Sequence, residues 1–434
     1  MNKLPKILII GAYTFDGDDA TSITLRNMFE NWDVKNIAFI HLTSEPVQKK
    51  SKYSIFTLSN FIFGNVKIND SKKSFINNVR ASRSLLPGVQ GVTKNSSIKI
   101  SILNIIHTFL AAHKALIPYK YTKELDDFIQ GYHPDLIYSP LGDIRIMQII
   151  NRISVNYKIP VIPHFMDDWQ NTMYSQNSLL FFPRHILLSK LKKIIQRASF
   201  GFTISQKMAN EYSMKYNIPF FPFMNCISDP FKEIQTQNKQ ISKPLKLCYS
   251  GGLHLNRAQS LEVLCEVLKK MSINNDFELS IFTKPTDWEH SGDALSRFDF
   301  VKYMGFVKPE EISGRLMMQD ILVHVESFDP KIIKYTRLSI STKIPEYLSL
   351  AKPIIAIGPP NIASIEYLRS NNCALIIDSI NTESVSSVLK NLFNDKMQFD
   401  LLRNKAYALF KKNHETKEQQ LLLKEKLISA LNRS

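Results

Sequence analysis

The chain lacks any uninterrupted apolar run of about 18 residues, the length that a membrane-spanning helix requires. Its first apolar stretch, residues 7–10, is too short for a secretory signal, and no small-residue cleavage site follows it. Cysteine is scarce, and neither a CxxC pair nor a histidine cluster at metal-ligand spacing occurs. We therefore expect a cytoplasmic protein with reduced core thiols. The cysteines are Cys226, Cys248, Cys265 and Cys373.

Acidic residues are nearly absent from the stretch between Lys49 and Lys120. Twelve basic residues and a single acid, Asp70, give this stretch a net charge of +11, out of +16 for the whole chain. Such a field attracts an anionic partner, for example phospholipid headgroups or a lipid diphosphate. A basic surface that is merely solvated is the alternative. No nucleic-acid-binding motif accompanies the stretch, so we expect no nucleic acid partner.

Apolar runs typical of buried strands alternate with helical segments along the first half of the chain. The predicted strands lie at 6–13, 36–42, 134–142, 159–168 and 200–205, and the predicted helices at 21–29, 144–154 and 184–200. Strands separated by helices form right-handed crossovers and a parallel sheet. The apolar face of the segment 184–200 is expected to pack on this sheet while its lysines are solvated, with a membrane-interfacial helix as the alternative.

Prolines and polar residues interrupt the pattern between Pro219 and Pro244 and indicate a linker. The alternation then restarts, with strands predicted at 245–252, 278–283, 300–307, 320–327, 353–359 and 373–378. The sequence thus predicts an α/β protein of two doubly wound, Rossmann-like domains, 1–225 and 226–415, followed by a charged amphipathic helix at 416–434. Ligands of such sheets bind beyond the carboxyl ends of the strands.

The strongest motif, STKIPEYLSLAKPIIAIGP, runs from Ser341 to Pro359. Hydroxyls and a lysine precede a short helix, and Glu346 follows Lys343 by three residues. A helix N-terminus and a lysine suit a diphosphate, and a carboxylate on the first turn suits the hydroxyls of a ribose. The alternative is an ordinary capping box, in which the glutamate bonds back to the start of the helix.

This segment resembles the donor-binding motif of the family-4-like retaining glycosyltransferases, in the form where a lysine precedes Glu-Tyr-Leu. The resemblance implies the GT-B fold, with two domains that face each other across a cleft, and it assigns Glu346 to the ribose. Ser341, Thr342 and Lys343 would line the diphosphate. The family has a second glutamate where this chain has Leu338, and Glu326 is the candidate that replaces it as the sugar-contacting carboxylate.

Two further loops of the second half are similar to the family's donor loops. Gly251 and Gly252 would let the backbone approach the ligand closely, and Arg257 would pair with a phosphate. Gly305 and Val307 lie in the segment similar to the loop that meets the nucleobase. A plain Gly-Gly turn is the alternative interpretation of the first loop.

The first half is implied to supply the acceptor side. His164, Asp167 and Asp168 are expected just past the end of a strand, where the family has a histidine or aspartate close to the transferred sugar. A histidine at a strand end also occurs for structural reasons alone. Asp16, Gly17 and Asp18 have the form of the DxD motif that binds Mn²⁺ or Mg²⁺ in the other major glycosyltransferase fold. We expect a polar turn there, no bound metal and no cofactor.

The sequence therefore predicts a hexosyltransferase-type enzyme of surface polysaccharide or glycan biosynthesis. It would move a sugar from a UDP- or GDP-linked donor to a glycan or lipid-linked acceptor, with retention of configuration implied by the resemblance. Peripheral association with an anionic membrane is expected. A GT-B-fold sugar-nucleotide epimerase and a non-catalytic basic membrane- or nucleic-acid-binding protein are the alternatives; an epimerase would need carboxylates on both sides of the sugar.

Overall fold

The computed structural model describes residues 4–17, 19–43, 51–59, 116–175, 178–230, 243–271 and 276–431. They group into two compact units, Met1–Phe223 with Gln420–Ser434, and Met224–Gln419. Asp18 and most of the basic stretch between Lys49 and Lys120 lie outside the described residues, so the predictions made on them are not addressed by the structure.

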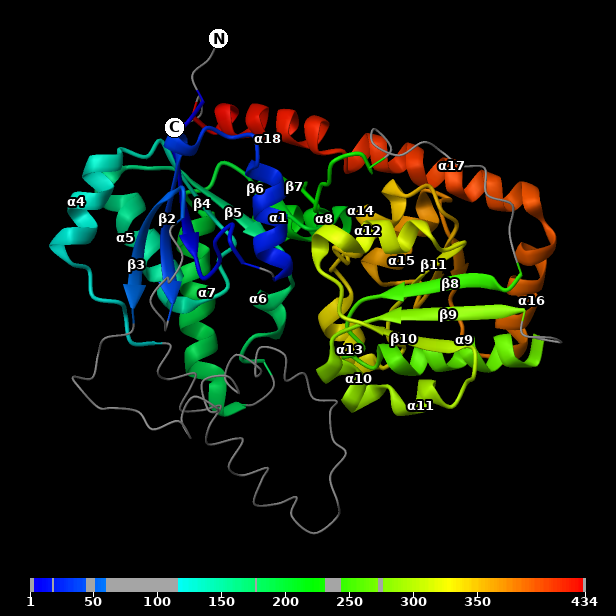
Figure 1. Ribbon diagram of the computed structural model, residues 1–434. Coiled ribbons are helices and arrows are strands. Elements are labelled where there is room, and N and C mark those ends of the chain that lie inside the picture. The colour runs from blue at the N-terminus through cyan, green and yellow to red at the C-terminus, as the bar shows by residue number, and fades with distance from the viewer. Residues whose placement is uncertain are drawn as a thin grey trace. The chain divides into compact units, whose positions relative to one another are not determined.

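The first unit is built on a seven-stranded sheet in the order β3-β2-β1-β4-β5-β6-β7 (Figure 1). All its strand pairs are parallel. Its strands are β1 (Ile7–Gly11), β2 (Ile37–Thr43), β3 (Ser54–Ser59), β4 (Leu136–Ser139), β5 (Val161–Phe165), β6 (Gly201–Thr203) and β7 (Phe220–Pro222). The order reverses between β1 and β4, which is the position where doubly wound sheets bind ligands.

Capping side chains mark the start of α1, α4, α5 and α8 in the first unit. Asp143 accepts a hydrogen bond from the backbone N of Arg145 at 2.7 Å, and Ser205 accepts one from Met208 N at 3.0 Å. The helices are α1 (Ala20–Phe29), α4 (Lys123–Tyr132), α5 (Ile144–Tyr157), α6 (Trp169–Thr172), α7 (Phe181–Ile195) and α8 (Gln206–Tyr216), with the short 3₁₀ turns η1 (Val34–Asn36) and η3 (Ser178–Leu180).

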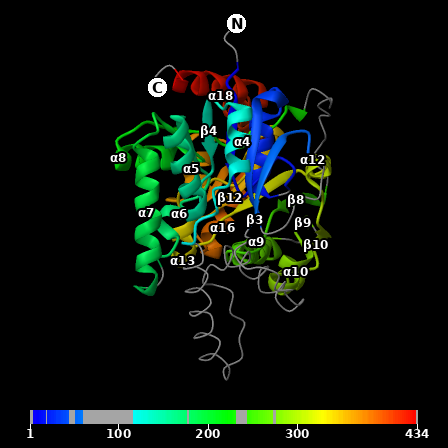
Figure 2. The same cartoon turned by 90° about the vertical axis from the view of Figure 1, so that its left-hand side faces the viewer.

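Helix α7 corresponds to the helix predicted at 184–200. Its residues Leu187, Leu191, Ile194 and Ile195 are buried, and the helix packs against β5 and against α5, which lies beside it in Figure 2. The prediction that this apolar face packs on the sheet is confirmed. The face is therefore not free to lie in a membrane interface.

The second unit contains a six-stranded parallel sheet in the order β10-β9-β8-β11-β12-β13. Its strands are β8 (Leu245–Ser250), β9 (Phe277–Phe282), β10 (Val301–Gly305), β11 (Ile321–Val325), β12 (Ile354–Ile357) and β13 (Leu375–Ile377). The order reverses between β8 and β11. These two strands therefore flank the expected ligand position of this unit.

Helices cover both faces of the second sheet. Its helices are α9 (Arg257–Met271), α10 (Pro285–Ser291), α11 (Asp293–Ser296), α12 (Pro309–Met317), α13 (Pro330–Thr336), α14 (Lys343–Ser349), α15 (Ala363–Ser370), α16 (Thr382–Asn394) and α17 (Lys396–Asn413). Along β8, Leu247 and Tyr249 enter the core beneath α9 and α16, whereas Cys248 enters the opposite core beneath α14 and α15. This alternation is what a strand buried on both faces requires.

The helix predicted from Thr416 is α18 (Thr416–Leu431), whose residues from Gln420 onward group with the first unit. Gln420 donates to the backbone O of Asn27 at 2.8 Å, and the ammonium of Lys426 lies 3.6 Å from the ring centre of Phe221. Among the described residues, no helix has the length and apolar character needed to cross a membrane.

Candidate functional site

The turn after β8 is held by side chains from two segments, β8 and α10. The Tyr249 hydroxyl donates to the backbone O of Gly252 at 2.7 Å, and Asp287, on α10, accepts from Leu253 N at 3.1 Å. Leu255 and Asn256 both have left-handed backbone angles, with φ of 62° and 57°. Non-glycine residues in this region indicate local strain, which often occurs at functional sites. The turn delivers the chain to Arg257, the first residue of α9.

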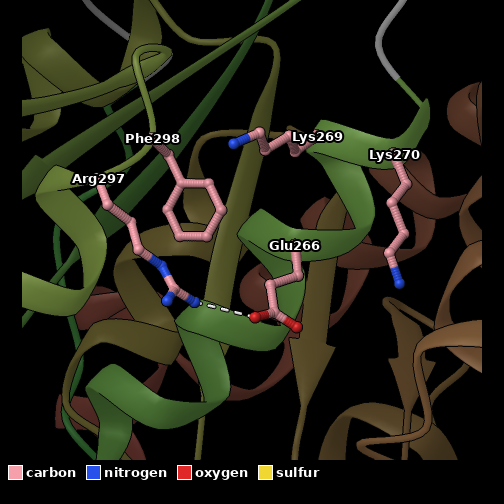
Figure 3. Close-up of a pocket in the computed structure, with 5 residues that line it drawn as sticks. All are labelled: Glu266, Lys269, Lys270, Arg297 and Phe298. Atoms are coloured by element: carbon pink, nitrogen blue, oxygen red, sulfur yellow. Dashed lines mark hydrogen bonds and ion pairs between the residues drawn. The ribbon is translucent and has the colours of Figure 1, made fainter.

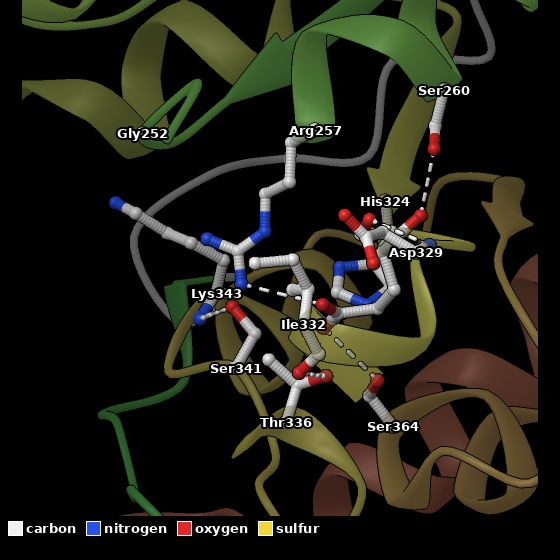
Figure 4. A network of polar contacts seen from close by, with 12 residues as sticks. Gly252, Arg257, Ser260, His324, Asp329, Ile332, Thr336, Ser341, Lys343 and Ser364 are labelled. Carbon is white, nitrogen blue, oxygen red and sulfur yellow. Dashed lines mark hydrogen bonds and ion pairs between the residues drawn. The ribbon is translucent and has the colours of Figure 1, made fainter. Parts of the chain in front are cut away.

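Arg257 forms a buried ion pair with Glu326, which directly follows β11. An Arg257 guanidinium nitrogen lies 3.4 Å from Glu326 Oε2, and the two side chains are 18% and 4% exposed. Ser364 donates to Glu326 Oε1 at 3.2 Å, and His324 Nε2 lies 3.3 Å from the same oxygen without hydrogen-bond alignment. Figure 4 shows this network, with Gly252, Arg257 and Lys343 to the left and His324 and Ser260 to the right.

Electrostatics keep both partners of this pair charged. Burial opposes ionisation of Glu326, but Arg257 and His324 together with the hydroxyl of Ser364 lower its pKa to about 2. Burial likewise disfavours the charge of Arg257, yet the Glu326 carboxylate outweighs it and raises the Arg257 pKa. Both Glu326 oxygens thus have partners within the protein. The predicted contact of Glu326 with the sugar remains a prediction, and the structure gives this residue a second role, that of orienting Arg257.

The motif at Ser341 to Glu346 forms the start of α14. Lys343 Nζ lies 3.2 Å from Glu346 Oε2, with the two side chains 34% and 12% exposed. Ser313 donates to the other Glu346 oxygen at 3.3 Å. Thr342, at the N-cap, makes no side-chain capping bond. The Glu346 carboxylate contacts Lys343 and Ser313 and not the backbone at the start of the helix. The structure therefore does not show the capping box that was the alternative interpretation.

Tyr347, which the sequence analysis did not single out, connects this motif to β8. Its hydroxyl accepts from Ser250 N at 2.9 Å and lies 3.4 Å from Ser250 O as a donor. The side chain is fully buried. It thereby connects α14 to the strand that precedes the Gly251–Gly252 turn. In the sequence Tyr347 is one of several aromatic and apolar residues of a predicted helix. No local pattern predicts its hydrogen bond to Ser250, 97 residues earlier.

Gly305 ends β10 with φ of 76°, a conformation that side chains other than glycine rarely adopt. Its carbonyl accepts from Thr283 N at 3.1 Å. Phe306, beside it, is 56% exposed, while Val307 is half-buried and packs against the core. The loop thus offers an exposed aromatic ring next to a glycine, which fits the predicted contact with a nucleobase.

His164 is a core residue within β5, and its predicted position past the strand end is corrected. It is 0% exposed; Nε2 lies 3.1 Å from the backbone O of Phe223, and Nδ1 is hydrogen-bonded to the Tyr138 hydroxyl. Since a carbonyl only accepts, Nε2 carries the proton and Nδ1 accepts. Burial lowers the His164 pKa to about 3, so the ring is neutral. A neutral imidazole with both ring nitrogens hydrogen-bonded can be buried within a strand.

The two aspartates after β5 differ in solvent exposure. Asp167 is exposed, whereas Asp168 is 2% exposed and accepts from the Tyr212 hydroxyl at 2.7 Å and from Asn171 at 2.8 Å. Asp168 therefore stabilises the start of α6. Of the three residues predicted here, Asp167 presents its side chain to solvent at the carboxyl end of the strand.

The loop after β1 is anchored to α1. Gly17 N donates to Thr14 O at 3.4 Å, and Arg26 donates to the backbone O of Phe15 at 2.9 Å. A Cβ on Gly17 would lie 2.3 Å from Ser22 Oγ, which explains the glycine. Among the described residues no group of three His, Cys, Asp or Glu side chains could hold a metal ion. Metal independence remains a prediction, since Asp18 is not described.

A separate hollow of about 600 Å³ lies on the carboxyl half of α9 (Figure 3). It is lined by Glu266, Lys269, Lys270, Arg297 and Phe298. Arg297 forms an ion pair with Glu266 at 2.9 Å, so the positive charge of Arg297 is neutralised by a residue of the same hollow. At about 1.5 Å per helical residue, Lys270 lies about 20 Å from Arg257 along α9. The hollow is therefore distinct from the candidate site.

The candidate site thus gathers Gly251, Gly252, Arg257, Glu326, Lys343 and Glu346 at the switch point of the second sheet. Two cations, each paired with a carboxylate, lie beside backbone turns at the carboxyl ends of β8 and β11. Such an arrangement can bind a diphosphate through the cations and hydroxyls through the carboxylates.

No family model matches the chain, and no curated protein matches it. Solved structures match over nearly its full length. HepE from Anabaena in complex with UDP is 11% identical, with 98% of this chain and 100% of that chain covered and a TM-score of 0.64. A UDP-forming α,α-trehalose-phosphate synthase from Burkholderia vietnamiensis is 9% identical, with 99% and 100% covered and a TM-score of 0.62. A glycosyltransferase from Rickettsia africae is 11% identical, with both chains fully covered and a TM-score of 0.57.

At these identities the likeness concerns the fold, and the predicted fold class is confirmed: the chain has the GT-B architecture of two parallel-sheet α/β units.

Proposed function

We propose that the chain is a glycosyltransferase that takes its sugar from a nucleotide-sugar donor bound by the second unit. The observation that carries the proposal is the pairing of Lys343 with Glu346 and of Arg257 with Glu326 at the switch point between β8 and β11. HepE, whose fold this chain shares, has been crystallised with UDP and with UDP-glucose, which supports the same class of donor here.

In the proposed reaction the bond between the anomeric carbon and the diphosphate oxygen breaks, and an oxygen of the acceptor hydroxyl or phosphate bonds to the anomeric carbon. The proton of an acceptor hydroxyl passes to the departing diphosphate. Negative charge accumulates on the leaving diphosphate. Lys343 and Arg257 stabilise it electrostatically, and Glu326 holds Arg257 in place for this role. Glu346 would exchange its bond to Lys343 for the ribose hydroxyls. Asp167 is the carboxylate that the first unit offers at the end of β5. Retention of configuration follows from the resemblance to the family-4-like enzymes.

The proposal is tested by binding of UDP and GDP to wild type, Lys343→Ala and Glu346→Ala, measured calorimetrically. Loss of a charge-assisted hydrogen bond costs about 1.5–3 kcal/mol, or roughly 10- to 150-fold in affinity. Lys390→Ala, an exposed lysine on α16, is the matched control and should bind like wild type. Unchanged affinity in both site variants would refute the assignment. Incubation with UDP- and GDP-sugars then separates transfer, which releases the nucleoside diphosphate, from epimerisation, which does not.

The acceptor is proposed to be a glycan or lipid-linked sugar at an anionic membrane surface, within polysaccharide or glycan biosynthesis. Support comes from the net charge of +11 between Lys49 and Lys120. The amino end of α7 adds Phe181 and Phe182, which are 72% and 57% exposed, on a helix that carries basic residues and no acid. Exposed aromatics beside cations suit a membrane interface.

Vesicle co-sedimentation tests this proposal. Binding to anionic vesicles should weaken with salt, because exposed charges are screened within about 8–10 Å at 0.1–0.15 M. Phe181→Ser with Phe182→Ser should weaken it further, while Met397→Ser, an exposed apolar residue on α17, should not. Equal binding to neutral and anionic vesicles would refute it.

A further inference from the structure

His254 lies in the turn between β8 and α9, and no motif of the sequence drew attention to it. Its Nδ1 lies 3.4 Å from Asp287 Oδ2, and its side chain is 54% exposed. Asp287 Oδ2 also accepts from the backbone N of Leu253 at 3.1 Å. Asp287 therefore fixes both the backbone of the turn and the imidazole that the turn carries.

The imidazole occupies the space beside Gly252. A Cβ added to Gly252 would lie 2.3 Å from His254 Nδ1 and 2.8 Å from Asp287 Oδ2. Gly252 is not among the glycines with positive φ, so its backbone does not itself require glycine. The side chain of His254, with Asp287 behind it, is what excludes a side chain at position 252. The ring is thus held directly against the Gly251–Gly252 turn.

We propose that His254 is a diphosphate-binding residue, held by Asp287 against the Gly251–Gly252 turn. This inference rests on the proposed function, since it adds a third side chain to Arg257 and Lys343 at the diphosphate. A carboxylate only accepts, so Nδ1–H donates to Asp287. In the imidazolium, Nε2–H is then a second donor, available to a phosphate oxygen.

The position of the turn supports this assignment. Gly252 follows the end of β8 by two residues, at the switch point where Arg257 and Glu326 meet. Asp287 lies close enough to Arg257 to contribute to its electrostatics. In Figure 4 the turn at Gly252 lies on the same side of the network as Arg257 and Lys343.

The test measures affinity for UDP, GDP and the corresponding nucleosides by calorimetry. His254→Ala should weaken diphosphate binding by about 5- to 30-fold, less than a fully buried charged bond because the ring is half exposed. Affinity for the nucleoside should not change. His290→Ala, an exposed histidine on α10, is the matched control and should bind like wild type.

An exchange of positions makes the test sharper. In the His254→Ala background, Gly252→Lys should recover part of the lost affinity, because the imidazole no longer blocks position 252 and only the carboxylate of Asp287, 2.8 Å from the added Cβ, must shift to admit it. Gly252→Ala in the same background should recover none, since it fills space without adding charge. Gly252→Lys alone should bind worse than wild type. Thermal melts verify that each variant is folded.

The outcomes separate this inference from the proposed function. If wild type binds a nucleoside diphosphate and His254→Ala binds it equally well, the inference is wrong and the proposed function stands. The inference is also wrong, with the proposed function intact, if His254→Ala weakens binding of the nucleoside and of the diphosphate alike. If wild type binds neither UDP nor GDP, both fail.

Discussion

At the scale of single residues, Glu326 is where two roles can be told apart. Glu326→Gln keeps an acceptor for Ser364 but loses the attraction for Arg257, and we expect a loss of about 1.5–3 kcal/mol in unfolding free energy. If Glu326 orients Arg257, affinity for UDP and for UDP-sugar falls by the same factor, because the diphosphate is common to both. If Glu326 instead contacts the sugar, only the UDP-sugar is affected. Calorimetry with both ligands decides between these roles.

The same residue predicts a dependence of stability on pH. Its folded-state pKa of about 2 lies below the ordinary value of 4.5, so its stabilising contribution is complete above pH 4.5 and declines as the pH falls toward 2. The unfolding free energy of Glu326→Gln should therefore decline less steeply than that of wild type below pH 4.5. Urea titrations between pH 6 and pH 3 measure the difference.

Burial of His164 also predicts that the unfolding free energy decreases as the pH falls, in a range that begins at a higher pH. The unfolded histidine binds a proton near pH 6.5, whereas the buried ring resists protonation down to about pH 3. Wild-type stability should therefore decrease as the pH falls below 6.5. His164→Ala should lessen this decrease but cost about 1–3 kcal/mol at pH 8, because Phe223 O and the Tyr138 hydroxyl lose their partner.

The activity of the folded His164→Ala protein separates a structural role from a catalytic one. Because the ring is fully buried, we expect kcat per folded molecule to stay near that of wild type. A kcat lowered by a hundredfold or more, with donor affinity unchanged, would instead support the predicted contact with the sugar.

At the scale of elements, α14 and β8 are joined by the Tyr347 hydroxyl. Tyr347→Phe leaves Ser250 N without this partner in a buried position, which costs about 1–3 kcal/mol. Because α14 carries Lys343 and Glu346, we expect a lower donor affinity as well. Tyr212→Phe, which removes a buried bond to Asp168 in the first unit, is the matched control. It should lower the melting temperature without changing UDP affinity.

Some strands could be predicted from the sequence and others could not. Strands with continuous apolar runs, such as β8 and β11, are predictable because burial on both faces leaves a local signature. β7 resembles a linker in the sequence because prolines surround it; it is the last strand of its sheet, and an edge strand tolerates the missing N–H of Pro222. β3 lies at the opposite edge and has no long apolar run.

In the candidate site, too, one ion pair could be predicted from the sequence and the other could not. Lys343 and Glu346 are three residues apart on one helix, so their pairing could be anticipated from spacing. Arg257 and Glu326 are separated by 69 residues, and their ion pair depends on how β8 and β11 lie next to each other. The prediction that His164 lies past the strand end was wrong, because a polar residue near the end of an apolar run usually lies outside the core. Its two partners, Tyr138 and Phe223, are distant in the sequence.

At the scale of the whole molecule, the sequence predicts turnover without a bound metal. Basic residues would neutralise the diphosphate in place of a divalent cation. We expect EDTA to leave the release of nucleoside diphosphate from the donor unchanged within about twofold. A complete loss of turnover that Mn²⁺ restores would show that the turn at Asp16 binds a metal.

All four cysteines of the chain are free and buried, and all four lie in the unit Met224–Gln419. Burial raises the pKa of Cys265 and of Cys373 to about 12, so their reactive thiolate form is rare in the folded protein. A thiol reagent added to the native protein should therefore react only as this unit opens, and the other unit adds no signal. The rate of thiol labelling therefore measures how fast the unit Met224–Gln419 opens. A cysteine engineered onto the surface can carry a fluorophore against almost no background.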